Sequence, residues 1–169
     1  MRYVRNSSSR FATALTIVVT IVLGLVIYIP VVQAETSYDL NNCYSGTATD
    51  LYRTKELTIL TVDAKGIALS NNESKIFGNS TFHSTQVLQI VNGEWKRFGH
   101  TKFMDPDGDY FFVEVTGGKN ADIRFLYGTG KWKGITGTGK FERIARGKAI
   151  EPGTFQGCVR NTGSFELPK

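Results

Sequence analysis

From residue 35 onward, short runs rich in Val, Ile, Thr, Phe and Tyr alternate with clusters of Gly, Asn and Asp. This texture is typical of strands joined by tight turns. No segment in this region repeats apolar residues at helical spacing over the length of a helix. The candidate strands are 43–49, 56–63, 81–91, 94–104, 110–116, 122–127, 139–146, 155–160 and 163–167. The chain therefore predicts a single all-β domain, an antiparallel barrel or sandwich of about eight strands.

Two turns carry specific signals. Asn92-Gly93 separates two candidate strands, and Asn-Gly is the preferred pair for a two-residue type I′ turn. The segment Asp105-Pro106-Asp107-Gly108 suits a type I turn, with Gly108 as the left-handed residue of a three-residue loop. The second turn sets a register in which Asp105 faces Asp109.

That register divides the hairpin 94–116 into two faces, because side chains alternate along a strand. His100 then lies opposite Glu114 on a mixed face that suits solvent, a ligand wall or a contact between subunits. The opposite face is predicted to point into the core. It carries Trp95, Gly99, Thr101, Phe103, Phe111, Val113 and Val115. A slip of one residue, to a type I′ turn at Asp107-Gly108, would exchange the two groups.

The first 34 residues have the pattern of a secretory signal peptide. Arg2, Arg5 and Arg10 precede an apolar run over 11–32, and Val32-Gln33-Ala34 predicts cleavage between Ala34 and Glu35. The alternative is an uncleaved membrane anchor, since about twenty apolar residues can span a bilayer. Either interpretation predicts an exported domain over 35–169, secreted or periplasmic in the first case and membrane-anchored in the second.

The net charge of +5 consequently says little about partners. Three of the 20 basic residues belong to the first 34 residues, so 17 basic groups face 15 acidic groups in the remainder. A nearly neutral domain gives no reason to expect a nucleic-acid partner. We expect membrane contact only through the N-terminal segment.

The two cysteines, Cys43 and Cys158, lie near the two ends of the predicted domain. In an exported domain a lone pair is most simply one disulfide. Such a bond would tie the first strand to the last. Neither residue has another Cys or a His at metal-ligand spacing, and we expect no metal site and no cofactor.

Two further motifs suggest ligands but fail in detail. Asp105, Asp107 and Asp109 resemble a calcium loop, yet Tyr110 stands where the loop needs glycine, and Thr116 where it needs an acid. The stretch 134–140 satisfies the start of a phosphate loop, but Phe141 replaces the Ser or Thr that holds Mg²⁺.

The stretch 127–139, YGTGKWKGITGTG, resembles the G-T-G-[KR]-aromatic-x-G-x-x-G segment of allene oxide cyclase-like and dirigent-like proteins. The hairpin at 105–109 also looks like theirs, and the overlap runs from about His83 to Gly139. The chain looks most similar to small exported bacterial members of that group. The resemblance implies an eight-stranded antiparallel, calycin-like barrel with a central cavity, and self-association, since plant members are often trimers. It transfers no active site, because the matched residues are structural glycines.

Candidate catalytic residues come from the hairpin. A carboxylate beside an imidazole would raise its basicity, so His100 and Glu114 form the best available dyad. The alternative is an ordinary cross-strand charge pair on a wet face. Arg97, on the predicted core face, is either an inward-facing anion clamp or a strand-end residue that extends outward to solvent.

A basic stretch near the C-terminus is the other candidate site. Its basic residues are Lys131, Lys133, Lys140, Arg143, Arg146 and Lys148, with Glu142 as the one acid among them. With aromatic residues interleaved, the stretch could bind an anionic polymer or lipid headgroups; otherwise it is a solvated face of two strands.

Three functions remain open. The first is a barrel that binds a small apolar ligand without converting it. The second, implied by allene oxide cyclase, is a cyclase or isomerase whose hydrophobic cavity folds a reactive substrate. The third is a surface-interaction protein that works through the stretch Lys131–Lys148.

Overall fold

A computed structural model describes residues 34–168. The predicted signal peptide or anchor, apart from Ala34 at its predicted cleavage site, lies outside the described residues. Ala34 and Glu35 directly precede the first strand. The described part of the chain contains no helix long and apolar enough to cross a membrane.

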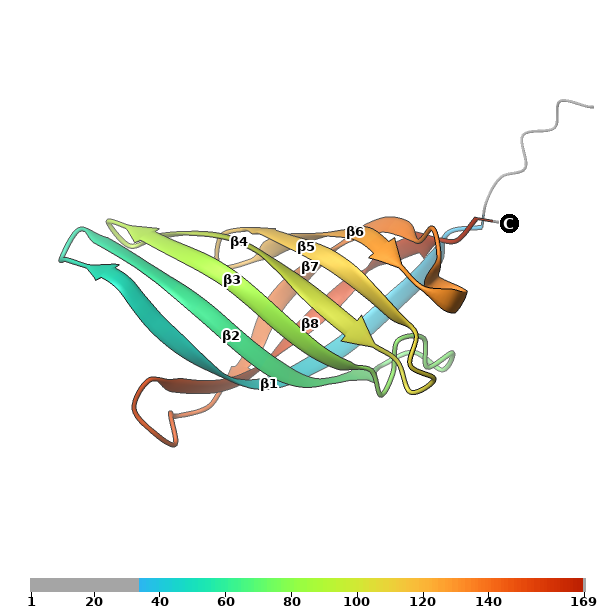
Figure 1. Ribbon diagram of the computed structural model, residues 1–169, viewed down its shortest axis with the longest axis horizontal. Helices are drawn as coiled ribbons and strands as arrows, with labels where there is room; N and C mark the ends of the chain where they lie inside the picture. The colour runs from blue at the N-terminus through green and yellow to red at the C-terminus, as the bar shows by residue number, and fades with distance from the viewer. Residues whose placement is uncertain (1–33, 169) are drawn as a thin grey trace, which may run out of the picture. The chain divides into compact units, whose positions relative to one another are not determined.

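Eight antiparallel strands close into a barrel in which each strand pairs with its sequence neighbours and the last pairs with the first (Figure 1). A short 3₁₀ helix, η1 (Gly130–Trp132), lies between β6 and β7. The strands are β1 (Thr36–Arg53), β2 (Leu57–Ser70), β3 (Thr81–Val91), β4 (Glu94–Met104), β5 (Tyr110–Gly117), β6 (Ala121–Gly128), β7 (Thr136–Arg146) and β8 (Thr154–Glu166).

The predicted turns and register are confirmed. Asn92 and Gly93 both have positive φ, 49° and 85°, as a type I′ turn requires. The Gly108 N–H donates to the Asp105 carbonyl at 3.0 Å, and Gly108 has φ 92°. His100 accordingly pairs with Glu114 in the ladder between β4 and β5.

The two expected C-terminal strands are one continuous strand, and β1 and β2 are longer than expected. Asn161 looks like a turn residue, yet its backbone pairs with Leu40 on one side and Phe141 on the other. Asp39 and other polar residues make the start of β1 hard to predict from the sequence. Tyr38 and Leu40 nevertheless alternate inward there, as a half-buried strand demands.

The predicted disulfide closes the barrel. Cys43 lies directly opposite Cys158 where β1 pairs with β8, and their sulfur atoms are bonded. The bond links positions 115 residues apart. Disulfides are typical of proteins that fold in an oxidising compartment, which agrees with an extracytoplasmic location.

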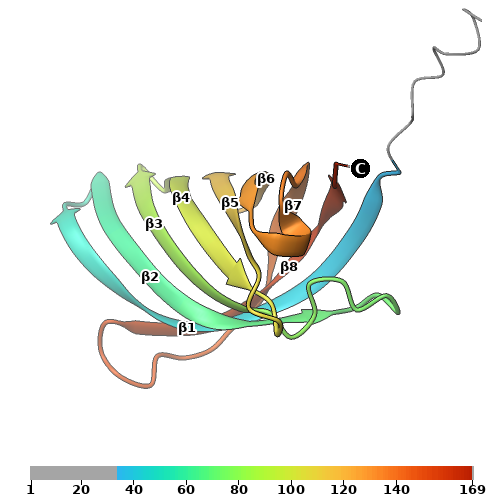
Figure 2. The same cartoon turned by 45° about the vertical axis from the view of Figure 1, so that its right-hand side comes forward.

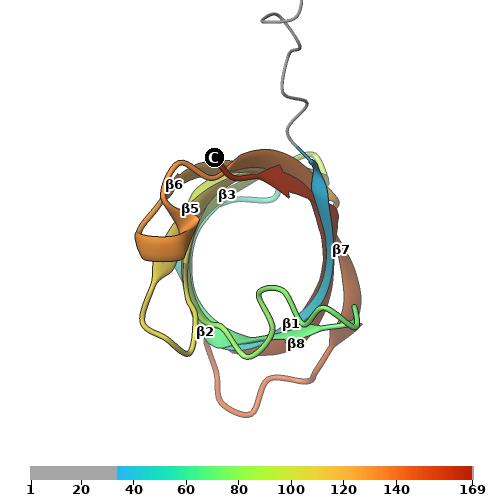
Figure 3. The ribbon, with the colours of Figure 1, turned by 90° about the vertical axis from the view of Figure 1, so that its right-hand side faces the viewer.

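The two ends of the barrel differ in character. We call the end that bears the connections 71–80, 105–109 and 129–135 the aromatic end. Figure 3 looks onto it and shows the connection 71–80, in green, reaching over part of the ring of strands. The opposite end bears the connections 54–56, 92–93, 118–120 and 147–153, and we call it the arginine end (Figure 2).

A cluster of rings fills the aromatic end. Phe77, from the connection 71–80, is buried with its ring centroid 4.6 Å from that of Phe111 and 4.8 Å from that of Trp132. The centroid of its ring also lies 4.9 Å from that of Phe165 and 5.5 Å from that of Tyr38. Phe77 has φ 57°, a strained value for a bulky residue, and the packing of its ring offsets that strain.

Candidate functional site

The interior of the barrel is not filled toward the arginine end. A cavity of about 440 Å³ lies there, within the size range of small-molecule pockets. Phe82 and Phe103 line it and also belong to the buried aromatic cluster. The aromatic end thus closes one side of the cavity.

Most of the wall is apolar because the inward positions of the strands carry apolar side chains. Leu88 of β3 pairs with Arg97 of β4. On the other side of β4, Gly99 pairs with Val115 of β5. The apolar lining residues are Ala48, Leu60, Val62, Ala64, Phe82, Leu88, Trp95, Phe103, Val113, Val115, Ile123, Phe141, Phe155 and Val159. Such a wall suits an apolar ligand.

Arg97 lies on the inner face of β4, between Trp95 and Gly99, and lines the cavity. Its Nε donates a hydrogen bond to the Gly118 carbonyl at 2.8 Å, and its guanidinium carbon lies 4.4 Å from the centre of the Phe141 ring. Its Nη2 is buried and has no hydrogen-bond partner among residues 34–168. Burial, and then the positive charge of Arg143, lower the pKa of Arg97 to about 10.

Three more arginines, Arg53, Arg143 and Arg146, line the cavity. Asp50 is the one carboxylate among the described lining residues, and Arg53 binds it through Nε and Nη2, both at 2.7 Å. That hydrogen bonding lowers the pKa of the Asp50 carboxyl. With Asp50 paired, the lining keeps an excess of positive charge.

Other polar groups line the inner wall. The Thr101 hydroxyl donates to Ser84 at 2.8 Å, and the Gln86 amide donates to the same Ser84 hydroxyl at 2.9 Å. The amide oxygens of Asn42 and Asn161 are buried and have no hydrogen-bond partner in the described part of the chain. These two residues, on adjacent strands β1 and β8, give the cavity a polar strip.

The residues predicted as a catalytic group do not share one site. Arg97 points into the barrel, whereas His100 and Glu114 lie on its outer face. The Glu114 carboxylate accepts a hydrogen bond from Arg124 at 2.9 Å, and His100 packs edge-on against Phe98 at 5.3 Å between ring centroids. The wall of the barrel separates the dyad from Arg97.

The second histidine, His83, has a partner that sequence reasoning missed. Its Nε2 lies 2.6 Å from the Asp63 carboxylate on the outer face of β2 and β3. Both side chains are about half exposed, so this pair belongs to the solvated surface.

The basic stretch is divided between the two ends of β7. Lys131, in η1, lies at the aromatic end, whereas Arg143 and Arg146 line the cavity toward the arginine end. The Lys131 Nζ is already occupied, at 2.7 Å from Asp105 and 2.5 Å from Asp107. Lys133, Lys140 and Lys148 are exposed. The basic residues of the interval Lys131–Lys148 are therefore spread from the aromatic end to the arginine end of β7, and Arg143 and Arg146 are exposed as well.

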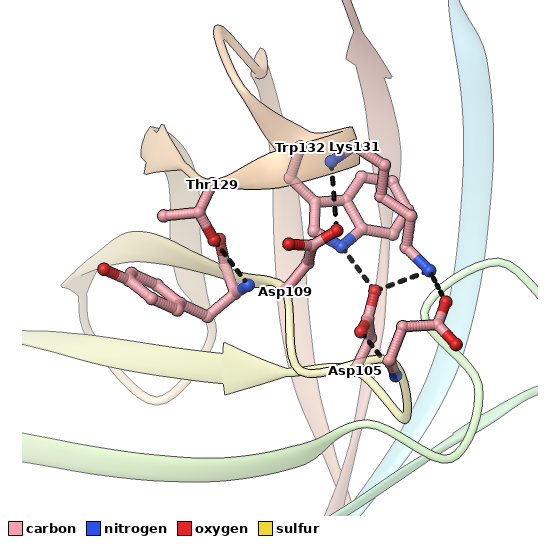
Figure 4. A network of polar contacts seen from close by, with 7 residues as sticks. Asp105, Asp109, Thr129, Lys131 and Trp132 are labelled. Atoms are coloured by element: carbon pink, nitrogen blue, oxygen red, sulfur yellow. Dashed lines mark hydrogen bonds and ion pairs between the residues drawn. The ribbon is translucent and has the colours of Figure 1, made fainter.

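The two sequence motifs that carry the family resemblance contact each other (Figure 4). The Trp132 indole N–H donates to the buried Asp105 carboxylate at 2.9 Å, and the Lys131 backbone N–H donates to Asp109 at 3.1 Å. Gly130 has φ 48°, and a side chain there would collide with the Asp109 carboxylate. These motif residues fasten the β4–β5 turn to η1, a structural role.

Sequence reasoning did not single out Asn42, Asn161 or the cavity arginines other than Arg97 as one site. They come from different strands and meet only because the barrel closes. The alternation of inward and outward positions was the one available signal. Asn42 and Asn161 depart from the apolar pattern of the inward positions because their polar side chains are buried.

Comparisons with known proteins support the fold. The sequence matches no established family profile and no curated protein. Among solved structures, the pterocarpan synthase dirigent protein GePTS1 is similar, with a TM-score of 0.52 and 9% identity over 80% of this chain and 93% of that chain. The pterocarpan synthase dirigent protein PsPTS1 has a TM-score of 0.48 and 10% identity over 80% of this chain and 96% of that chain. The chain is thus a closed antiparallel barrel distantly similar to dirigent proteins in fold.

Proposed function

We propose that this protein is an exported barrel that binds a small, mostly apolar ligand in its central cavity and does not convert it. The observation that carries the proposal is the cavity itself. It measures about 440 Å³, one side is closed by a packed aromatic cluster, and most of its wall is apolar. Barrels of about eight strands have room for one small ligand.

The chemistry of the lining favours binding over catalysis. Within the described residues, the wall contains no His, Cys or Lys, and its one carboxylate, Asp50, is paired with Arg53. A general base would have to be an unpaired group of suitable pKa within reach of the ligand. His100 and Glu114, the best dyad in the sequence, face the other side of the wall.

Cavity occlusion tests the proposal. Val62 lines the cavity on β2, and Val62→Trp would fill part of it. Val87, on β3, is exposed, so Val87→Trp adds the same bulk elsewhere. We expect native mass spectrometry of the purified full-length chain to show a bound small molecule in the wild type and in Val87→Trp.

We expect the same molecule to be lost from Val62→Trp, with its melting temperature recorded to show that the variant folds. Retention of the ligand by a folded Val62→Trp would contradict the cavity as its site. An empty wild-type barrel that also binds no added apolar compound would contradict ligand binding altogether.

A further inference from the structure

The charge inside the cavity specifies the ligand further. We infer that the bound molecule is a small organic acid, whose apolar body packs against the aromatic wall and whose acid group binds to Arg97 and Arg143. This inference rests on the proposed ligand-binding function and adds the chemical class of the ligand.

The hydrogen-bond pairing of Arg97 is incomplete. A guanidinium carries five N–H donors and is costly to bury unless they are satisfied. The Arg97 Nε has a partner in the Gly118 carbonyl, and the face of the group lies over Phe141. The buried Nη2 has no partner among the described residues. An oxygen of a ligand in the cavity would satisfy it.

The charged neighbour that acts most on Arg97 carries the same sign. Arg143 lies two residues after Phe141, the ring beneath Arg97, and also lines the cavity. Its charge acts on Arg97 strongly enough to lower the pKa of that guanidinium, after burial itself. Two like charges at an apolar wall are mutually unfavourable, and an anion between them removes the repulsion.

Among the described residues, the lining supplies no free anion of its own. Asp50 is the only carboxylate among the described residues of the lining, and both of its oxygens already bind Arg53. The remaining arginines therefore have no counter-ion within the wall. Arginine is also the residue whose planar fork matches an acid group in two hydrogen bonds.

The apolar wall indicates that the rest of the ligand, apart from its acid group, is apolar. A free inorganic anion would use the arginines and leave the aromatic and aliphatic lining without a partner. Trp95 lies with its ring centre 5.9 Å from the Arg143 guanidinium carbon, so the apolar wall continues up to the charged groups. An amphipathic acid satisfies both regions at once.

Decanoate and 1-decanol form a matched pair of probes, because they share an alkyl chain and differ in the acid group. With the purified full-length chain, calorimetric titration should show decanoate binding about tenfold to a hundredfold more tightly than decanol. That ratio corresponds to about 1.4–2.8 kcal/mol, the scale of a charge-assisted hydrogen bond. Decyltrimethylammonium should bind more weakly than decanol.

The variant Arg97→Met should prefer decanoate over decanol much less than the wild type does, since it keeps the apolar stem and removes one of the two charges that bind the acid group. Arg124→Met is the control, because Arg124 lies on the outer face and pairs with Glu114. It should keep the wild-type ratio. Residues 1–34 are present in every sample, so any binding to that segment is common to all of them.

Equal binding of decanoate and decanol by the wild type would overturn the inference and leave the proposed function standing. Binding of neither compound would contradict the proposed function itself. Displacement of decanoate by an equal concentration of inorganic phosphate would show a simple anion site and also overturn the inference. If Arg97→Met does not fold, Arg143→Met replaces it. A lower ratio of decanoate to decanol affinity in Arg143→Met than in the wild type supports the inference, and an unchanged ratio contradicts it.

Discussion

The indole nitrogen of Trp132 donates a hydrogen bond of 2.9 Å to the carboxylate of Asp105, a side chain that is only 3% exposed. Lys131 binds the same carboxylate at 2.7 Å. This contact joins the β4–β5 turn to η1 and places the Trp132 ring against Phe77, so it supports the packed side of the cavity.

Removal of that carboxylate should destabilise the barrel. Asp105→Ala leaves the buried indole N–H without an acceptor, so we expect the free energy of unfolding to fall by about 2–3 kcal/mol. Asp107 also binds Lys131 but is 74% exposed, and Asp107→Ala should cost about 1 kcal/mol or less. Urea denaturation measures both, and equal losses would contradict the role given to Asp105.

The same carboxylate predicts a dependence on pH. Burial raises the pKa of Asp105, but hydrogen bonds from Lys131 and Trp132 outweigh it and hold the pKa below its usual value. A carboxyl whose pKa is lower in the folded state stabilises the protein above its unfolded pKa of about 3.9. That contribution is lost as the pH falls through the folded pKa.

Asp105→Asn should therefore lose less stability than the wild type between pH 7 and pH 3. Denaturation curves at the two pH values give the comparison. Asp39 and Asp50 also have lowered pKa values, chiefly through hydrogen bonds from Arg160 and Arg53, so the variant removes only part of the dependence. An identical pH dependence in both proteins would refute the assignment to Asp105.

The disulfide should contribute more than any single contact. A loop closed over 115 positions is stabilised by about 4–5 kcal/mol in the chain-entropy estimate. We expect reduction with dithiothreitol to lower the free energy of unfolding by about that amount. The double variant Cys43→Ser/Cys158→Ser should start at the lower value and not respond to the reductant.

Phe77 should be the most sensitive position of the connection 71–80. Phe77→Ala removes a buried ring that contacts four others named above, and we expect a loss of about 3–4 kcal/mol. Phe98 is the matched control, because its ring is 52% exposed on the outer face of β4. Thermal denaturation should separate the two, and comparable losses would show that Phe77 is not part of the supporting core.

The sequence allowed the central hairpins to be predicted closely, because their turns have local signals. The strands β3 and β4 begin and end at the expected residues, and β5 ends one residue later than expected. Asn92-Gly93 and Asp105–Gly108 set the register of β3, β4 and β5, and with it the inward position of Arg97. The longer strands were harder to delimit. In β2, Asp63 and Lys65 look like a polar boundary, yet they are outward residues that alternate with inward Ala64 and Gly66.

The candidate site was less predictable than the fold. The inward position of Arg97 was expected on one register, but its neighbour Arg143 appeared to belong to a basic surface. Closure of the barrel, which pairs β8 with both β1 and β7, brings Arg143 into the same cavity. Such contacts between distant strands have no local signal in the sequence.

A crystal structure of the protein with decanoate tests the central claim most directly. The account predicts density for one decanoate inside the barrel, with a carboxylate oxygen about 2.7–2.9 Å from the Arg97 guanidinium and the alkyl chain directed toward Phe82 and Phe103. Decanoate bound only to the outer wall, or a barrel interior filled by its own side chains, would contradict it.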